Sequence, residues 1–136
     1  MLTIHGLVHV VLRTTQLEQM VYFYCSILGC QIERDLSKEL GLTQLRAGNA
    51  LIDLVTVNSE LGQMGGRAPQ QDGRNVDHLC LQITPLAEAS LIQYLDKHQI
   101  PHSDFDKRYG AQGFGRSIYI EDPEGNVIEL KPLNLE

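Results

Sequence analysis

Hydrophobic and polar residues alternate with a period of two in several short stretches of the chain, a pattern typical of β-strands. Near the C-terminus, residues 117–121 alternate in this way, and residues 127–132 resume the pattern after a break. The break is Asp-Pro-Glu-Gly-Asn at 122–126, where proline fixes φ and glycine tolerates a positive φ. The C-terminal part therefore predicts two strands joined by a tight turn.

The first half of the chain predicts four strands and one helix. The strands are predicted at 6–13, 30–36, 41–46 and 50–57. Thr15 and Glu18 have the spacing of a capping box. Hydrophobic residues then recur every three or four positions as far as Leu28, and Gly29 is a suitable C-cap. The predicted order of elements is βαβββ.

The second half repeats this order. Strands are predicted at 76–83, 117–121 and 127–132, and another strand is predicted to begin at Ile100-Pro101-His102. Thr84 followed by Pro85 predicts the N-cap and first position of a helix that extends to Leu95. A loop is predicted at 109–115.

A stretch rich in glycine separates the two halves. Residues 58–74 contain four glycines, one proline and few large hydrophobic residues, so they predict a loop. Loops of this length are usually functional or mobile. We therefore expect a single α+β domain made of two βαβββ modules, about 4–57 and 75–133, joined by the loop 58–74.

Composition and charge exclude several classes of protein. The net charge is −6, whereas a nucleic-acid-binding surface needs a basic patch. No hydrophobic run approaches the roughly 20 residues that span a bilayer, and the N-terminus lacks the pattern of a signal peptide. The odd set Cys25, Cys30 and Cys80 lacks metal-ligand spacing and fits packing roles in a reducing compartment. We expect a cytoplasmic protein that binds neither nucleic acid nor membrane.

Both predicted modules contain one imidazole and one carboxylate in corresponding strands. His9 and His78 fall in the first strand of each module, and Asp53 and Glu129 fall in the last. Two imidazoles with one or two carboxylates suit a divalent metal such as Zn²⁺, Ni²⁺, Mn²⁺ or Fe²⁺. Taken singly, each residue also has an ordinary explanation, as a hydrogen-bonded histidine or a solvated carboxylate. The repetition of the pair favours a metal site.

Four stretches of the chain resemble the vicinal oxygen chelate superfamily. This superfamily includes glyoxalase I, bleomycin-resistance proteins, extradiol dioxygenases, fosfomycin-resistance enzymes and methylmalonyl-CoA epimerase. The patterns F-Y-x-x-x-L-G and D-P-x-G-N-x-x-E-L occur in the order typical of the superfamily. The matching stretches are 8–13, 23–29, 77–81 and 119–130.

The resemblance implies a fold and a metal site. The strands of the two modules would curl into one open cup with a divalent metal on its inner wall, and members often form homodimers. The ligand positions of the superfamily fall on His9, His78 and Glu129. A fourth position, which is Glu in the glyoxalase I type, falls on Asp53, which is one methylene shorter and could bind the metal, bind it through water, or act as a nearby base.

Candidate substrate-binding residues cluster around the predicted strand at 117–121. Arg116 and Ser117 begin this strand, Tyr119 points to the same face as Ser117, and Arg108 and Tyr109 lie in the preceding loop. Arginine can grip a carboxylate or phosphonate with two hydrogen bonds. The sequence Gly-Arg-Ser-Ile-Tyr at 115–119 is similar to a stretch of fosfomycin-resistance enzymes. An edge arginine beside a core tyrosine is the alternative.

The sequence supports two classes of function. The first is a metal-dependent lyase or isomerase of glyoxalase I type on a small oxygenated substrate, with Glu129 or Asp53 as general base. Within this class, a fosfomycin-resistance-like opening of an epoxide is an alternative. The second class is a metal-free protein of bleomycin-resistance type that sequesters a ligand. The presence of His9, His78 and Glu129 together favours the first.

Overall fold

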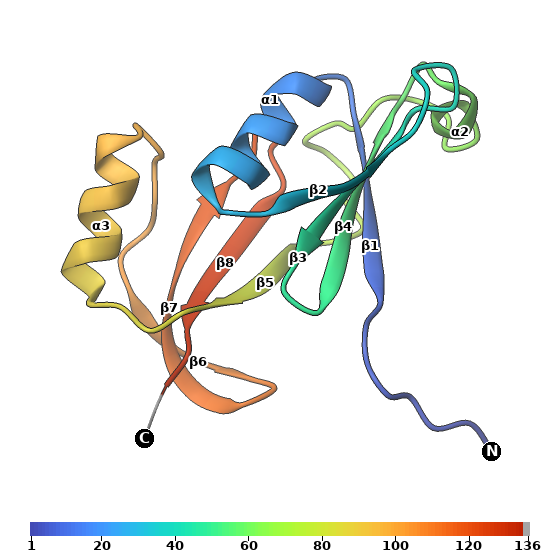
Figure 1. Ribbon diagram of the computed structural model, residues 1–136. Helices are drawn as coiled ribbons and strands as arrows, with labels where there is room; N and C mark the ends of the chain where they lie inside the picture. The colour runs from blue at the N-terminus through green and yellow to red at the C-terminus, as the bar shows by residue number, and fades with distance from the viewer. Residues whose placement is uncertain (135–136) are drawn as a thin grey trace. The chain divides into compact units, whose positions relative to one another are not determined.

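The computed structural model describes residues 1–134 and contains two four-stranded mixed sheets with a few helices. The contacts divide the chain into two compact units, Met1–Gln71 and Asp72–Glu136, and the boundary falls inside the predicted loop 58–74. We call these units the first and second modules. Figure 1 follows them along the chain from blue to red.

The first module has the order predicted from its sequence. Its sheet has the order β1-β4-β3-β2, in which β1 runs parallel to β4 and the other pairs are antiparallel. A π-helix, η1, continues α1 without a break, and a short helix, α2, follows the sheet. The elements are β1 (His9–Thr14), α1 (Leu17–Val21), η1 (Tyr22–Ile27), β2 (Gln31–Asp35), β3 (Leu42–Ala47), β4 (Ala50–Thr56) and α2 (Glu60–Gln63).

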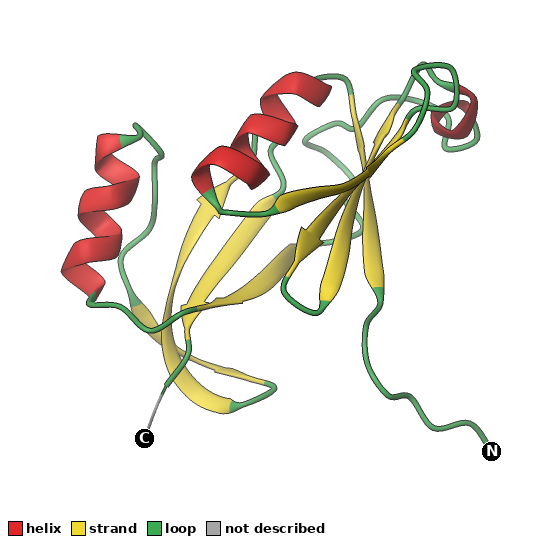
Figure 2. Ribbon diagram, viewed as in Figure 1, coloured by secondary structure: helices red, strands yellow, loops and turns green. Residues whose placement is uncertain are grey.

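The second module repeats the topology of the first. Its sheet has the order β5-β8-β7-β6, and β5 is again parallel to β8. Figure 2 shows that this module has one long helix and that β7 is strongly curved. The elements are β5 (His78–Ile83), α3 (Glu88–Lys97), β6 (Asp106–Gly110), β7 (Gly113–Glu121) and β8 (Val127–Pro132). The predicted α+β class and the paired βαβββ order are confirmed.

Alternation along β8 gives the second sheet two different faces. Ile128 and Leu130 are buried, and so are their neighbours Ile118 and Ile120 in β7. Burial of one such side chain contributes about 1.5–3 kcal/mol, so this face supplies much of the stability of the module. The other face of β8 carries Glu129 and Lys131, which are buried as well. The sheet therefore combines a hydrophobic face with a buried polar face.

Both long helices begin later than the sequence predicts. In α1 the first carbonyl acceptor belongs to Gln16, which bonds the amide of Met20, so the N-cap predicted at Thr15 is wrong by one residue. In α3 the amides of Ser90 and Leu91 both bond to the carbonyl of Ala87. The helix predicted with Thr84 as its N-cap therefore starts three residues later, with Ala87 as the N-cap, because its hydrophobic face begins at Leu91 rather than at the exposed Leu86.

The β6–β7 hairpin is longer than predicted. Residues 109–115 were expected to form a loop, but Tyr109 pairs with Phe114 and Gly110 pairs with Gly113. Gly113 has a φ of +91°, which lets the chain reverse within two residues. The strand expected from Ile100 instead begins at Asp106.

The glycine-rich stretch is folded around Arg13. The guanidinium of Arg13 donates hydrogen bonds to the carbonyls of Gly62, Gly66 and Arg67 at 2.6–2.9 Å. A Cβ at Gly65 would lie 2.4 Å from Nε of Arg13, so a larger residue there would displace the guanidinium. The first part of the predicted loop thus packs against β1. None of the helices among residues 1–134 is long and hydrophobic enough to cross a membrane.

The turn predicted at 122–126 is present and closely held. One carboxylate oxygen of Asp122 accepts hydrogen bonds from the amides of Glu124 and Asn126, each at 2.9 Å. Arg74 donates to the carbonyl of Glu124 and to the side chain of Asn126. Gly125 has a φ of +85°, as a glycine in a tight turn permits. The turn therefore fixes the register between β7 and β8.

His102 makes the stability of the second module depend on pH. Its Nδ1 donates to the carbonyl of Ser103 at 2.7 Å and its Nε2 donates to Asp96 at 2.9 Å. These two bonds require a proton on each nitrogen, and they raise the pKa of His102, the bond to Ser103 most. A raised pKa stabilises the folded state fully below the ordinary pKa of histidine, and this stabilisation is lost as pH rises through the folded pKa.

We therefore expect the free energy of unfolding to decrease between pH 6 and pH 8 by a larger amount in the parent than in His102→Gln. Urea denaturation at several pH values measures this difference. His98→Gln is the matched control, since His98 makes a ring contact with Tyr94 on the same helix. An equal pH dependence in parent and His102→Gln would contradict the role of His102.

Candidate functional site

The carboxylate of Glu129 is the centre of the polar face of the second sheet. Glu129 is 6% exposed. Ser117, on the neighbouring strand β7, donates its hydroxyl to Oε2 at 2.7 Å. The other oxygen, Oε1, lies 3.2 Å from Nε2 of His78 on β5. The structure thus brings together three of the residues predicted from sequence, each from a different strand.

His78 is oriented by two neighbours. Its Nδ1 lies 2.8 Å from a carboxylate oxygen of Asp77, whose side chain is 97% exposed. Its ring meets the ring of Tyr119 edge to face, with centroids 5.3 Å apart. In the tautomer with the proton on Nδ1, which Asp77 can accept, the lone pair of the imidazole lies on Nε2, the nitrogen that faces Glu129. This tautomer is the one that a metal ligand needs.

Cys80 also borders Glu129. The two residues are paired in the register between β5 and β8 and therefore share a face of the sheet. Burial raises the pKa of the Cys80 thiol to about 11, and the charge of Glu129 and a hydrogen bond with it act in the same direction. The sulfur is therefore a protonated thiol at neutral pH, which suits a hydrogen-bond donor rather than a nucleophile.

Arg108 brings a positive charge to the same face. Its guanidinium lies 4.2 Å from the centroid of the Tyr119 ring. It also donates to the carbonyl of Ser117 at 2.7 Å and to the hydroxyl of Ser117 at 3.0 Å. Ser117 and Tyr119 thus lie between a guanidinium and the pair His78–Glu129.

The other two predicted substrate residues point to the opposite face. Arg116 precedes Ser117 in β7, so their side chains point in opposite directions. The guanidinium of Arg116 donates to both carboxylate oxygens of Glu88 at 2.7 and 3.2 Å. Tyr109 is 74% exposed and packs edge to face against Phe114. Neither side chain is among the neighbours of Glu129 described above.

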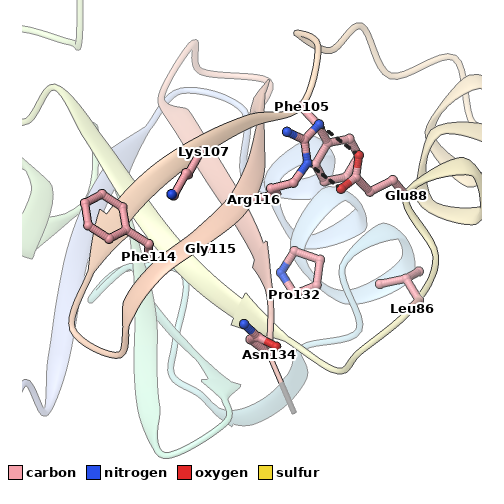
Figure 3. A pocket seen from close by; sticks show the side chains of 9 residues that line it. All are labelled: Leu86, Glu88, Phe105, Lys107, Phe114, Gly115, Arg116, Pro132 and Asn134. Carbon is pink, nitrogen blue, oxygen red and sulfur yellow. Dashed lines mark hydrogen bonds and ion pairs between the residues drawn. The ribbon is translucent and has the colours of Figure 1, made fainter. Parts of the chain in front are cut away.

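Arg116 instead lines a shallow pocket of about 420 Å³ in the second module. Figure 3 shows the ion pair between Arg116 and Glu88 at one end of this pocket and Lys107 and Phe114 at the other. The ammonium of Lys107 lies 4.8 Å from the centroid of the Phe114 ring. The remaining lining residues are Leu86, Phe105, Gly115, Pro132 and Asn134.

In the first module, Asp53 has one carboxylate oxygen without a partner. Asp53 is 3% exposed, and Gln44 donates to its Oδ2 at 3.1 Å. Arg34 in turn donates to the side-chain oxygen of Gln44. Within residues 1–134, no hydrogen-bond donor reaches the buried Oδ1. A buried carboxylate oxygen is seldom left unpaired, and such an atom is often part of a functional site.

His9 lies on the same face of the first sheet as Asp53. Asp53 is paired with Val11 in the register between β1 and β4, and His9 is two residues before Val11. His9 is exposed. Each module therefore supplies one imidazole and one carboxylate from neighbouring parallel strands.

These donors are of the kinds that bind divalent metals. Imidazole nitrogen and carboxylate oxygen suit Zn²⁺, Ni²⁺, Mn²⁺ and Fe²⁺. Within residues 1–134, no three side chains of His, Cys, Asp or Glu converge in a way that could hold a metal ion. The two atoms best suited to a metal are Nε2 of His78 and Oε1 of Glu129, and Oδ1 of Asp53 has no competing partner. Each module thus supplies one pair of donors of these kinds.

Residues 6–130 match the sequence profile of the Glyoxalase/Bleomycin resistance protein/Dioxygenase superfamily. The chain belongs to this superfamily. Its members include enzymes that act on different substrates, so membership alone does not assign a reaction.

One relative in sequence and several solved structures are similar to this chain. Biphenyl-2,3-diol 1,2-dioxygenase 3 of Rhodococcus globerulus is 27% identical over 133 aligned positions. The match covers 92% of this chain and 62% of the relative, so this chain spans less than two thirds of that protein. A protein from the mobile metagenome of V. pseudocholerae is 25% identical, with a TM-score of 0.75 and coverage of 98% of both chains. The fosfomycin resistance protein FosX of Listeria monocytogenes is 20% identical, with a TM-score of 0.70 and coverage of 98% of this chain and 97% of that one.

Several neighbours of the predicted site residues were not assigned to the site from sequence. They are Gln44, Asp77 and Cys80, and the first and last become neighbours of Asp53 and Glu129 through strand register. The strand register could have identified Gln44 and Cys80, but the register depends on the order of the strands in the sheet. The sequence also favoured Arg116 over Arg108, because the loop predicted at 109–115 left the direction of Arg108 open.

The unpartnered oxygen of Asp53 should lower the free energy of unfolding of the metal-free protein. A buried carboxylate costs more free energy than a buried amide. We expect Asp53→Asn to raise the free energy of unfolding of the metal-free protein by about 1 kcal/mol, as is common when a functional residue is replaced. Urea denaturation in the presence of a chelator measures the change.

Asp35→Asn is the matched control, because Asp35 accepts a hydrogen bond from the hydroxyl of Thr43 and should gain nothing from the same replacement. A loss of stability in Asp53→Asn larger than that in Asp35→Asn would show that the buried carboxylate is a structural element rather than a functional one.

Proposed function

We propose that this chain is a divalent-metal-dependent lyase or isomerase of glyoxalase I type that acts on a small oxygenated substrate. The observation that carries the proposal is the arrangement of Glu129, whose Oε2 is held by Ser117 while Oε1 faces Nε2 of His78 at 3.2 Å. A carboxylate that is fixed through one oxygen presents the other in a defined direction, as metal-ligating carboxylates commonly do. We assign His9 of the first module as a further metal ligand.

The two carboxylates have different surroundings, which suggests different roles. Glu129 already has Ser117, His78 and the Cys80 thiol around it, so it suits a fixed ligand. Asp53 is held through Oδ2 by Gln44, and its Oδ1 has no donor among residues 1–134. We therefore assign Asp53 Oδ1 as the general base, which would take a proton from the substrate and return it to the product.

The metal, when bound, would polarise a substrate oxygen as a Lewis acid. His78 would bind it through Nε2, with the proton of Nδ1 held by Asp77. Glu129 would bind it through Oε1, and Ser117 would keep the carboxylate in place through Oε2. Loss of Glu129 would therefore remove a ligand, whereas loss of Asp53 would remove the acceptor for the proton.

The position of Arg108 favours a substrate with a negative charge. Its guanidinium lies over the ring of Tyr119 and next to the hydroxyl of Ser117, on the face that carries Glu129. A carboxylate or phosphonate could replace the bond to Ser117 with a charge-assisted one. This observation supports a second candidate, the opening of an epoxide that bears an anionic group, as in the fosfomycin-resistance-like alternative.

Metal content tests the proposal directly. We expect protein purified without an affinity tag to contain close to one divalent metal per chain by elemental analysis, and His9→Ala and Glu129→Ala to lose it. Metal at a hundred times its Kd should stabilise the parent by about 2.7 kcal/mol, a gain that both variants should lack in thermal unfolding.

His5→Ala is the control for this experiment, because His5 is an exposed histidine near His9 in the chain. A parent protein that contains no metal and takes up none when it is added would overturn the catalytic proposal. A metal-free protein that binds a ligand, of bleomycin-resistance type, would then be the better description.

Anion binding distinguishes the role of Arg108 from that of Arg116. We expect Arg108→Gln to weaken binding of methylphosphonate to the metal-loaded protein about tenfold or more, since a hydrogen bond to a charged group contributes about 1.5–3 kcal/mol. Arg116→Gln should leave this binding unchanged, because its guanidinium is engaged by Glu88. Isothermal titration calorimetry measures both; a loss confined to Arg116→Gln would reverse the assignment and support the prediction made from sequence.

A further inference from the structure

Lys131 is a lysine in the interior of a strand whose side chain is almost completely buried. It is 5% exposed and lies two residues after Glu129 in β8, on the same face of the sheet. A buried ammonium costs free energy unless its donors are satisfied, and lysine is rarely buried to this extent. The proposed function leaves this residue without a role.

The ammonium of Lys131 joins both ends of the β6–β7 turn. Nζ donates to the carbonyl of Arg108 at 3.0 Å and to the carbonyl of Gly113 at 3.0 Å. Arg108 belongs to β6, and Gly113 is the first residue of β7. A single side chain from β8 therefore fastens the strands of the hairpin on either side of its turn.

Two glycines make room for this side chain. A Cβ at Gly115 would lie 2.9 Å from Cε of Lys131, and a Cβ at Gly110 would lie 3.0 Å from Nζ. Neither glycine has a positive φ, so glycine is needed at these positions for the space that it leaves and not for its backbone conformation. The lysine and the glycines form one unit, in which the stem of Lys131 crosses β7 at Gly115.

The hairpin that Lys131 fastens carries the residues that hold Glu129. Arg108 bonds the hydroxyl of Ser117, and Ser117 bonds Oε2 of Glu129. The chain of contacts thus runs from Lys131 through the backbone of Arg108 to its guanidinium, to Ser117 and to the carboxylate. We propose that Lys131 is a positioning residue, which sets the β6–β7 hairpin so that Arg108 and Ser117 orient Glu129.

The test compares Lys131→Met, which keeps the length of the stem and removes the ammonium, with the parent. We expect amide hydrogen exchange of residues 108–117 to accelerate about tenfold or more, while amides of the first module are unchanged. Mn²⁺ affinity, whose interpretation rests on the proposed function, should fall about tenfold or more, as is typical when a residue that orients a ligand is lost. Lys107→Met is the control, because Lys107 lies on the same hairpin and points to the opposite face.

Chemical rescue separates positioning by a cation from simple packing. Lys131→Ala leaves space for a short alkyl chain and two free carbonyls. We expect propylammonium to restore slow exchange in residues 108–117 and to restore Mn²⁺ affinity, and 1-propanol of the same shape to restore neither. Unchanged exchange in Lys131→Met, or equal rescue by the alcohol, would overturn the proposal.

The hydrogen-exchange measurement does not require a bound metal. If the parent binds no Mn²⁺, the proposed function fails, and the exchange rates of the hairpin still decide the role of Lys131. If Lys131→Ala does not fold, Gly115→Ala provides the second variant, because its Cβ would displace the stem of Lys131 and leave the charge in the chain. Normal exchange of residues 108–117 in Gly115→Ala would then contradict the inference.

Discussion

The burial of a carboxylate in the middle of a strand determines how the second module is built. A buried carboxylate without partners would cost several kcal/mol. Glu129 is nevertheless 6% exposed, and the structure surrounds it with the hydroxyl of Ser117, the imidazole of His78 and the thiol of Cys80. Because these groups come from the strands on both sides of β8, the order β5-β8-β7 is itself a condition for burying the charge. The hydrophobic face of the same strands supplies the stability that this polar face does not.

Strand alternation is the reason why much of the architecture was predictable. A period of two identified most of the strands and placed Glu129 opposite Ile128 and Leu130. It also identified His78 and Asp53 as polar residues within hydrophobic strands. The tight turn at 122–126 followed from local turn chemistry, which the hydrogen bonds of Asp122 confirm.

What the sequence did not predict depends on contacts between distant residues. Arg116 lies in the stretch similar to fosfomycin-resistance enzymes, but Glu88, 28 residues earlier, binds its guanidinium. Arg108 is instead directed to Ser117 because the β6–β7 hairpin is longer than predicted. The start of α3 was misplaced because Thr84 and Pro85 satisfy the local rules for a helix start while the buried face begins at Leu91. Local preferences give way to packing wherever the two disagree.

In both modules a long cationic side chain is held by backbone carbonyls, an arrangement that was not predicted from the sequence. In the first module the guanidinium of Arg13 is held by three carbonyls of the glycine-rich stretch, and in the second the ammonium of Lys131 is held by two carbonyls of the hairpin. In both, a glycine leaves room for the long side chain: Gly65 for Arg13 and Gly115 for Lys131. In each module a strand thus fastens another segment of the chain through a cation rather than through a hydrophobic contact.

The surroundings of Tyr119 have a consequence for spectroscopy. The chain contains five tyrosines and no tryptophan, so its near-ultraviolet absorption and emission come mainly from tyrosine. Tyr119 has a guanidinium over its ring and the imidazole of His78 at its edge. A change in charge at either group alters the field across this chromophore. The protein therefore contains an internal optical reporter of its polar face, and difference spectra can be recorded without a label.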